Sequence, residues 1–228
     1  MADRQQTPNL SRRLLAEALG TFFLLAGIVG SGIMAKALAG PNDALALLAN
    51  AIATGMLLTV LILIFAPISG AHFNPAVSLV MALRRDIAPG LALLYVLIQV
   101  LAGSLGVLAA HAMFDQPLIQ ISATARSSPG LLIAEVVATF GLLATILGLA
   151  RYGVSHIAAG VGLYITSAIW FTASTSFANP AVTVARTITD TFTGILPAHM
   201  PAFIAAQLLG ACLAWIAFGH LLAEDDGA

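Results

Sequence analysis

The chain has 228 residues, of which 60% are hydrophobic and only 8% are charged, and its formal net charge is −1. Soluble domains carry about 25% charged residues, so this composition excludes a water-soluble fold and predicts an integral membrane protein. A chain without a basic face cannot neutralise phosphates, which excludes a nucleic-acid partner. Cys212 is the only cysteine, so an intrachain disulfide and a metal cluster held by several thiolates are excluded as well. No cofactor and no metal are expected.

The sequence predicts six membrane-spanning helices, because crossing a bilayer takes about 20 mainly apolar residues in helical form. In chain order the apolar segments are 13–36, 44–66, 89–113, 130–150, 154–173 and 199–222. Helices are expected since lipid offers no partner to an open backbone. The first segment exceeds the roughly 7–15 apolar residues of a cleaved signal peptide, so it is predicted to be retained.

Two shorter apolar segments, 67–83 and 174–188, each contain the tripeptide Asn-Pro-Ala. Asn is favoured as a helix cap and Pro at the first helical position, so each tripeptide predicts the start of a helix. Short, proline-interrupted segments at matching places in two halves of a chain indicate discontinuous helices. The predicted fold is therefore an all-α membrane protein with six transmembrane helices and two re-entrant half-helices. The two starts are Asn74, Pro75, Ala76 and Asn179, Pro180, Ala181.

The two halves of the chain repeat each other. The segment "LLAEALGTFFLL" (14–25) aligns with "LIAEVVATFGLL" (132–143), which places Glu17 against Glu135. Likewise "LIQVLAGSLG" (97–106) aligns with "AAQLLGACLA" (205–214), with Gln99 against Gln207. Because each half has three spans, an odd number, the halves must be inverted relative to each other. We expect one channel domain over 1–228, with repeats at about 12–113 and 130–223.

Inverted symmetry brings the two half-helix starts together near the middle of the bilayer. Their unpaired N–H groups and partial positive charge then point at one place, and the amide groups of Asn74 and Asn179 add donors. Such a lumen accepts the oxygen of a neutral hydroxylated molecule and repels cations. Glu17 and Glu135 could relay protons or hold the re-entrant loops by hydrogen bonds, and the symmetry favours holding. His72 could line the pore or simply pack.

Two Asn-Pro-Ala copies in matched halves of an inverted six-span repeat resemble the aquaporin (major intrinsic protein) family over nearly the whole chain. The resemblance implies a passive channel with one pore per subunit, usually assembled as a homotetramer. It also implies a four-residue selectivity filter, where most members carry arginine directly after the second Asn-Pro-Ala. Here that position is Val182. The other implied filter positions are Thr54, Ser176 and, on the fifth span, either Ser167 by a gap-free count or Ile169 by aligning Gly162.

This filter would contain no charged and no aromatic side chain, which implies a constriction wider than that of a water-only pore. Arg186 lies one helical turn beyond Val182 on the same face. It could line the outer mouth and partly replace the missing arginine. Alternatively, it could be an interfacial anchor or a partner of Asp190.

The stretch "NPAVTVARTITDTF" resembles a bacterial branch of the family that lacks the filter arginine and is associated with arsenic-resistance genes. The resemblance implies metalloid hydroxides and methylated arsenicals as solutes. The leading hypothesis is a passive channel for small uncharged solutes, these or glycerol-like polyols, together with water. The alternatives are a strict water channel and an ion-coupled secondary transporter, which would need charges near the midplane. A membrane enzyme is disfavoured because no nucleophile–base pair is visible.

Basic residues predict the orientation, since cytoplasmic loops are enriched in them. With the N-terminus inside, more of them fall on the inner face than on the outer face. We therefore expect an integral protein of the plasma membrane, a bacterial inner membrane, with cytoplasmic N- and C-termini and with lipid as a partner. The inner set is Arg4, Arg12, Arg13, Arg84, Arg85 and Arg151, and the outer set is Lys36, Arg126 and Arg186.

Overall fold

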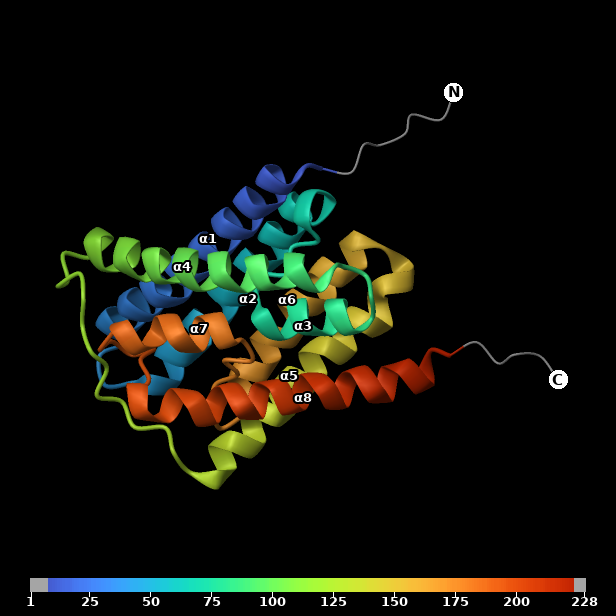
Figure 1. The fold of residues 1–228 in the computed structure, drawn as a ribbon. Coiled ribbons are helices and arrows are strands. Elements are labelled where there is room, and N and C mark those ends of the chain that lie inside the picture. The colour runs from blue at the N-terminus through green and yellow to red at the C-terminus, as the bar shows by residue number, and fades with distance from the viewer. Residues whose placement is uncertain (1–7, 224–228) are drawn as a thin grey trace.

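A computed structural model describes residues 8–223 of the chain, and all of its regular structure is helical. Among these residues, six helices are long and apolar enough to cross a membrane. Two short helices lie between them in the chain, so the predicted fold class is confirmed (Figure 1). The helices are α1 (Leu10–Ala39), α2 (Asp43–Ser69), α3 (Pro75–Leu83), α4 (Pro89–Met113), α5 (Pro129–Leu149), α6 (Val154–Phe171), α7 (Pro180–Ala185) and α8 (Met200–Leu221).

The helix ends follow from local sequence. The side chains of Asn9, Asn42 and Ser128 accept hydrogen bonds from the first turns of α1, α2 and α5. The end of α2 differs from the prediction, because the helix continues through Pro67 to Ser69 instead of stopping at 66. A proline in the last turn removes only one backbone donor, and Gly70 then ends the helix in a left-handed conformation.

Glycines allow the long helices to approach closely. A Cβ atom built on Gly162 of α6 would lie 2.7 Å from the carbonyl oxygen of Gly55 on α2. At equivalent places in the two halves, a Cβ on Gly106 would collide with the backbone of α1, and one on Gly210 with the backbone of α5. Small residues at such crossings are how helices associate in lipid, where no hydrophobic force draws them together.

The two half-helices α3 and α7 lie end to end in the middle of the molecule, between α4 and α8 (Figure 1). Each of them contacts both α4 and α8. The described chain begins and ends on the same side of the helix bundle, as six crossings require (Figure 1). This arrangement places the starts of α3 and α7 against each other.

Candidate functional site

The two motif asparagines cap the half-helices. Oδ1 of Asn74 accepts a hydrogen bond from the backbone N–H of Ala76 at 2.9 Å, and Oδ1 of Asn179 accepts one from Ala181 at 2.9 Å. Asn179 also accepts from the backbone of Val182 at 3.3 Å. Each proline occupies the first helical position, where its missing N–H leaves nothing unsatisfied.

The same asparagines also join the two loops. Nδ2 of Asn74 donates to the carbonyl oxygen of Ala178, and Nδ2 of Asn179 donates to that of Phe73, both at 2.8 Å. A side-chain amide carries two hydrogens, so one N–H of each asparagine is used between the loops and the other is left for the lumen. The sequence predicts that both amide groups donate to the lumen, and it carries no signal for these bonds between the loops.

Glu17 holds the loop before α3. Its Oε1 accepts hydrogen bonds from the Ser69 hydroxyl at 2.6 Å and from the backbone of His72 at 2.9 Å. Its Oε2 accepts from the backbone of Phe73 at 2.7 Å and from Nε2 of Gln99 at 2.8 Å. All four donors come from within the protein, so the buried carboxylate is fully hydrogen-bonded.

Glu135 does the same for the loop before α7. It accepts hydrogen bonds from the backbone of Phe177 and Ala178, both at 2.9 Å, and from Nε2 of Gln207 at 2.6 Å. Phe73 and Ala178, which precede the two asparagines, adopt φ angles of 49° and 48°, a left-handed conformation that is uncommon outside glycine. Their N–H groups are held by the glutamate of their own half and their carbonyls by the asparagine of the other half.

A cavity of about 690 Å³ passes the loop junction, and its lining residues come from both ends of the helix bundle. Asn74, Asn179 and His72 contribute to this lining, whereas Glu17 and Glu135 do not. His72 both lines the cavity and packs, since its ring lies edge-on to Tyr95 with centroids 5.2 Å apart.

The predicted filter positions Thr54, Ser176, Val182 and Ile169 all lie in the cavity lining, and all are buried. The hydroxyl oxygens of Thr54 and Ser176 have no hydrogen-bond partner among the described residues. Ser167, the other candidate on the fifth span, is exposed on the outside of α6 and donates to the carbonyl oxygen of Leu163, so that assignment is wrong. The contact between Gly162 and Gly55 fixes which face of α6 turns inward.

Arg186 follows α7 directly and is buried in the cavity wall. Its Nε donates to the carbonyl oxygen of Thr193, and its guanidinium carbon lies 3.4 Å from the ring centroid of Phe177. Asp190, the partner considered above, accepts instead from the backbone of Ala123 at 2.8 Å. Arg186 is therefore neither an interfacial anchor nor the partner of Asp190.

A second arginine in the cavity wall was not anticipated. Arg126, in the segment between α4 and α5, donates to the carbonyl oxygens of Gly194 at 2.9 Å and Ser174 at 3.3 Å. Its guanidinium carbon lies 5.0 Å from the Phe177 ring centroid. Burial lowers the pKa of Arg126 and the nearby Glu135 carboxylate offsets part of that effect, and a group this basic stays charged at neutral pH.

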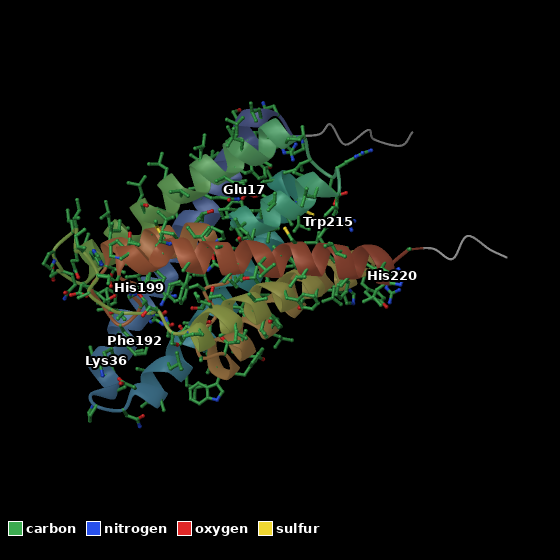
Figure 2. The ribbon with its side chains drawn as sticks, turned by 60° about the horizontal axis from the view of Figure 1, so that its bottom comes forward. Glu17, Lys36, Phe192, His199, Trp215 and His220 are labelled. Carbon is green, nitrogen blue, oxygen red and sulfur yellow. The ribbon has the colours of Figure 1, made fainter. Side chains whose placement is uncertain are left out.

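The segment 114–128 carries Arg126 into the cavity by pairing with the segment after α7. Backbone N–H groups of Ser122 and Leu196 donate across this pair to Thr187 at 3.0 Å and to Thr124 at 2.8 Å. The sequence of this loop has no periodic pattern that could have predicted its path. Lys36, Phe192 and His199 lie together at one end of the helix bundle, and His220 lies at the opposite end (Figure 2).

Comparisons with known proteins agree with this geometry. Residues 4–155 match the family model described as Major intrinsic protein. The chain is 54% identical over 211 residues to Aquaglyceroporin AqpS of Rhizobium meliloti (strain 1021), covering 90% of this chain and 88% of that protein. It is 29% identical over 231 residues to Aquaporin Z of Brucella melitensis biotype 1, covering 93% and 99%.

Among solved structures, the fold is similar to the X-ray structure of the aquaglyceroporin from Plasmodium falciparum. The TM-score is 0.68 at 20% sequence identity, with 95% of this chain and 97% of that chain covered. The resemblance drawn from the paired Asn-Pro-Ala motifs is confirmed. This chain belongs to the major intrinsic protein (aquaporin) family, whose members are membrane channels and not enzymes.

Proposed function

We propose that this protein is a passive channel for small uncharged solutes larger than water, with a filter formed by Thr54, Ser176, Val182 and Ile169. The observation that carries the proposal is the pair of buried hydroxyls on Thr54 and Ser176, which have no hydrogen-bond partner in residues 8–223 and belong to side chains of the cavity wall. A buried polar group without a hydrogen bond is costly. A permeating molecule with its own hydroxyls would satisfy both.

Val182 and Ile169 give the same ring an apolar side. A solute that carries both hydroxyl groups and an apolar part therefore suits this filter better than a strictly polar one. Methylated arsenicals and glycerol-like polyols meet this description, and metalloid hydroxides and water, which carry only the polar part, are small enough to accompany them. The 54% identical relative is named an aquaglyceroporin, which supports the polyols.

The loop junction would exclude cations. The half-helices α3 and α7 direct the positive ends of their dipoles toward the asparagines in the cavity wall. Such a potential repels protons and metal cations while the free amide N–H groups donate to solute oxygens. We therefore infer pore-lining roles for Asn74, Asn179 and His72, with Pro75, Ala76, Pro180 and Ala181 forming the first turns.

An ion-coupled transporter is the competing function, because it too is built from inverted repeats and broken helices. Its coupling ion would need carboxylates that face the path. The oxygens of Glu17 and Glu135 accept loop and glutamine hydrogen bonds, and neither residue contributes to the cavity lining. We assign both glutamates to holding the loops.

We further propose one channel domain, cytoplasmic N- and C-termini, a bacterial inner membrane and a homotetramer embedded in lipid. Two of the basic residues counted for the outer face, Arg126 and Arg186, line the cavity instead of the membrane surface. The basic excess on the opposite face is thus larger than the sequence alone suggests, which favours this orientation. Arg4, part of that excess, lies outside the described residues.

Permeability measurements on proteoliposomes test the function. We expect non-saturating flux of glycerol, arsenite and methylated arsenicals that does not respond to proton or sodium gradients. T54V and S176A should each lower glycerol flux about two- to tenfold, the value of one neutral hydrogen bond. S104A is the control, because the Ser104 hydroxyl already bonds the carbonyl of Val100 within α4. Accumulation against a gradient would refute the channel, and unchanged flux in T54V and S176A would refute the filter.

A further inference from the structure

Two arginines meet at one aromatic ring beyond the filter. The guanidinium carbons of Arg186 and Arg126 lie 3.4 Å and 5.0 Å from the ring centroid of Phe177, and all three residues line the cavity. Stacking on an aromatic face holds a guanidinium in place while its edge stays available for hydrogen bonds. Phe177 itself is fixed by the bond from its N–H to Glu135.

No carboxylate in the described part of the chain pairs with either arginine. The ion pairs among residues 8–223 are Lys36–Asp43 and Arg84–Asp86. Asp43 shares the cavity lining but is held by Lys36, and the Glu135 oxygens are taken by backbone and glutamine donors. Neither guanidinium therefore has an ion-pair partner among the described residues, and the single nearby carboxylate, Glu135, offsets only part of their two positive charges.

Both guanidiniums have donors to spare. Arg186 uses only Nε for a protein acceptor, and Arg126 uses Nε and Nη1. A guanidinium carries five N–H donors. Protein acceptors among the described residues therefore leave the other N–H groups of both guanidiniums free for a ligand.

We propose that Arg126 and Arg186 form a binding site for a small oxyanion in the cavity, next to the neutral filter. Two guanidinium groups, each with parallel N–H donors, suit the oxygens of a phosphate-like or carboxylate group. Such charge-assisted hydrogen bonds are stronger than hydrogen bonds between neutral groups. The site differs from a filter arginine in two ways. It uses two residues from different segments, and neither of them occupies the Val182 position.

A bound anion would obstruct the pore. The filter offers two hydroxyls and no charge, so it cannot replace the hydration that an anion would lose on entering. The anion would remain at the arginines and slow the passage of neutral solutes. This effect on flux rests on the proposed function, whereas the binding itself does not.

Calorimetric titration of the detergent-solubilised full chain with inorganic phosphate, at neutral pH and low ionic strength, tests the site. We expect a saturable isotherm that weakens at least about tenfold in R126Q, the value of one charge-assisted hydrogen bond, and less in R126K. R151Q should bind as the unaltered protein does. Arg151 is a matched control, since it also stacks on an aromatic ring, Tyr152 at 4.8 Å, but at the opposite end.

A second measurement, on the unaltered protein, tests the site even if R126Q does not fold. Raising the ionic strength from about 0.01 to about 0.15 M shortens the screening length from about 30 to about 8 Å, so phosphate affinity must fall. The site is refuted if the unaltered protein does not bind phosphate, if salt leaves the affinity unchanged, or if R151Q weakens it as R126Q does. External phosphate should also slow glycerol flux in proteoliposomes. Absence of any glycerol flux would count against the proposed function and leave the isotherm to decide the site.

Discussion

Nδ2 of Asn74 lies 2.8 Å from the carbonyl oxygen of Ala178, a residue 104 positions later in the chain. The same asparagine caps α3 through its Oδ1 atom. One side chain therefore starts a helix in the first half and satisfies a buried carbonyl in the second. An ordinary helix cap at the membrane surface does only the first of these.

This double use predicts that N74A is more destabilising than loss of a surface cap. Removing a cap costs about 1 kcal/mol, and leaving the Ala178 carbonyl buried without a partner costs about 1–3 kcal/mol more. Thermal unfolding in detergent measures the difference. N42A is the control, because Asn42 caps α2 at an exposed end without a second bond from its side chain. Equal shifts in the two variants would contradict the double role.

E135Q should lower both stability and solute flux. The carboxylate of Glu135 accepts from Phe177, Ala178 and Gln207, and an amide at this position would turn its own N–H₂ group toward one of these donors. We expect a loss of about 1–3 kcal/mol in the free energy of unfolding. D86N, at an exposed ion pair, should stay within about 0.5 kcal/mol. A variant of normal stability with altered proton coupling would support a relay role instead.

V182R should restore a narrow filter. A guanidinium here would fill the space of the small side chain and bring a third positive charge near Arg186 and Arg126. We expect glycerol permeability to fall on the order of tenfold, in the range of pocket-size discrimination, while water permeability changes less. Stopped-flow measurements on the same vesicles give both values. V182A, which does not narrow the ring, should retain glycerol flux, and unchanged glycerol flux in V182R would remove Val182 from the constriction.

G162A should separate α2 from α6. The added Cβ would collide with Thr59 and press on the carbonyl of Gly55, and overpacking of this kind costs typically about 1–3 kcal/mol. The melting midpoint in detergent should fall. Gly219, on α8, has no atom within 4 Å of its Cβ position, so G219A should be neutral or slightly stabilising because alanine favours helix. Similar midpoints for the two variants would show that the crossing tolerates a methyl group.

Much of the fold was predictable because it depends on local signals. Apolar length located the six spans, and Asn followed by Pro located both half-helix starts. The repeat alone predicted that Glu17 and Glu135 occupy equivalent positions in the two halves. The face that α6 turns inward was not predictable to a single residue, because it depends on where Gly162 meets Gly55 across two helices.

The cavity wall beyond the filter was the least predictable part. Arg126 belongs to an irregular loop whose course is set by backbone bonds to the segment after α7, and such bonds leave no pattern in side chains. Counting Arg126 and Arg186 as membrane-surface charges was reasonable from the sequence, but both lie in the cavity. The stacking on Phe177 could be found only once these segments were placed together.

The reciprocal bonds between the loops also constrain the order in which the protein can fold. The carbonyl oxygens of Phe73 and Ala178 each accept a hydrogen bond from an asparagine more than a hundred positions away in the chain. Neither bond can form until both halves are present. During synthesis, the first half must therefore wait in the membrane with its re-entrant loop incomplete, and closing so long a chain segment is slow. The loop junction at the centre of the pore therefore cannot be completed until both halves of the chain are present.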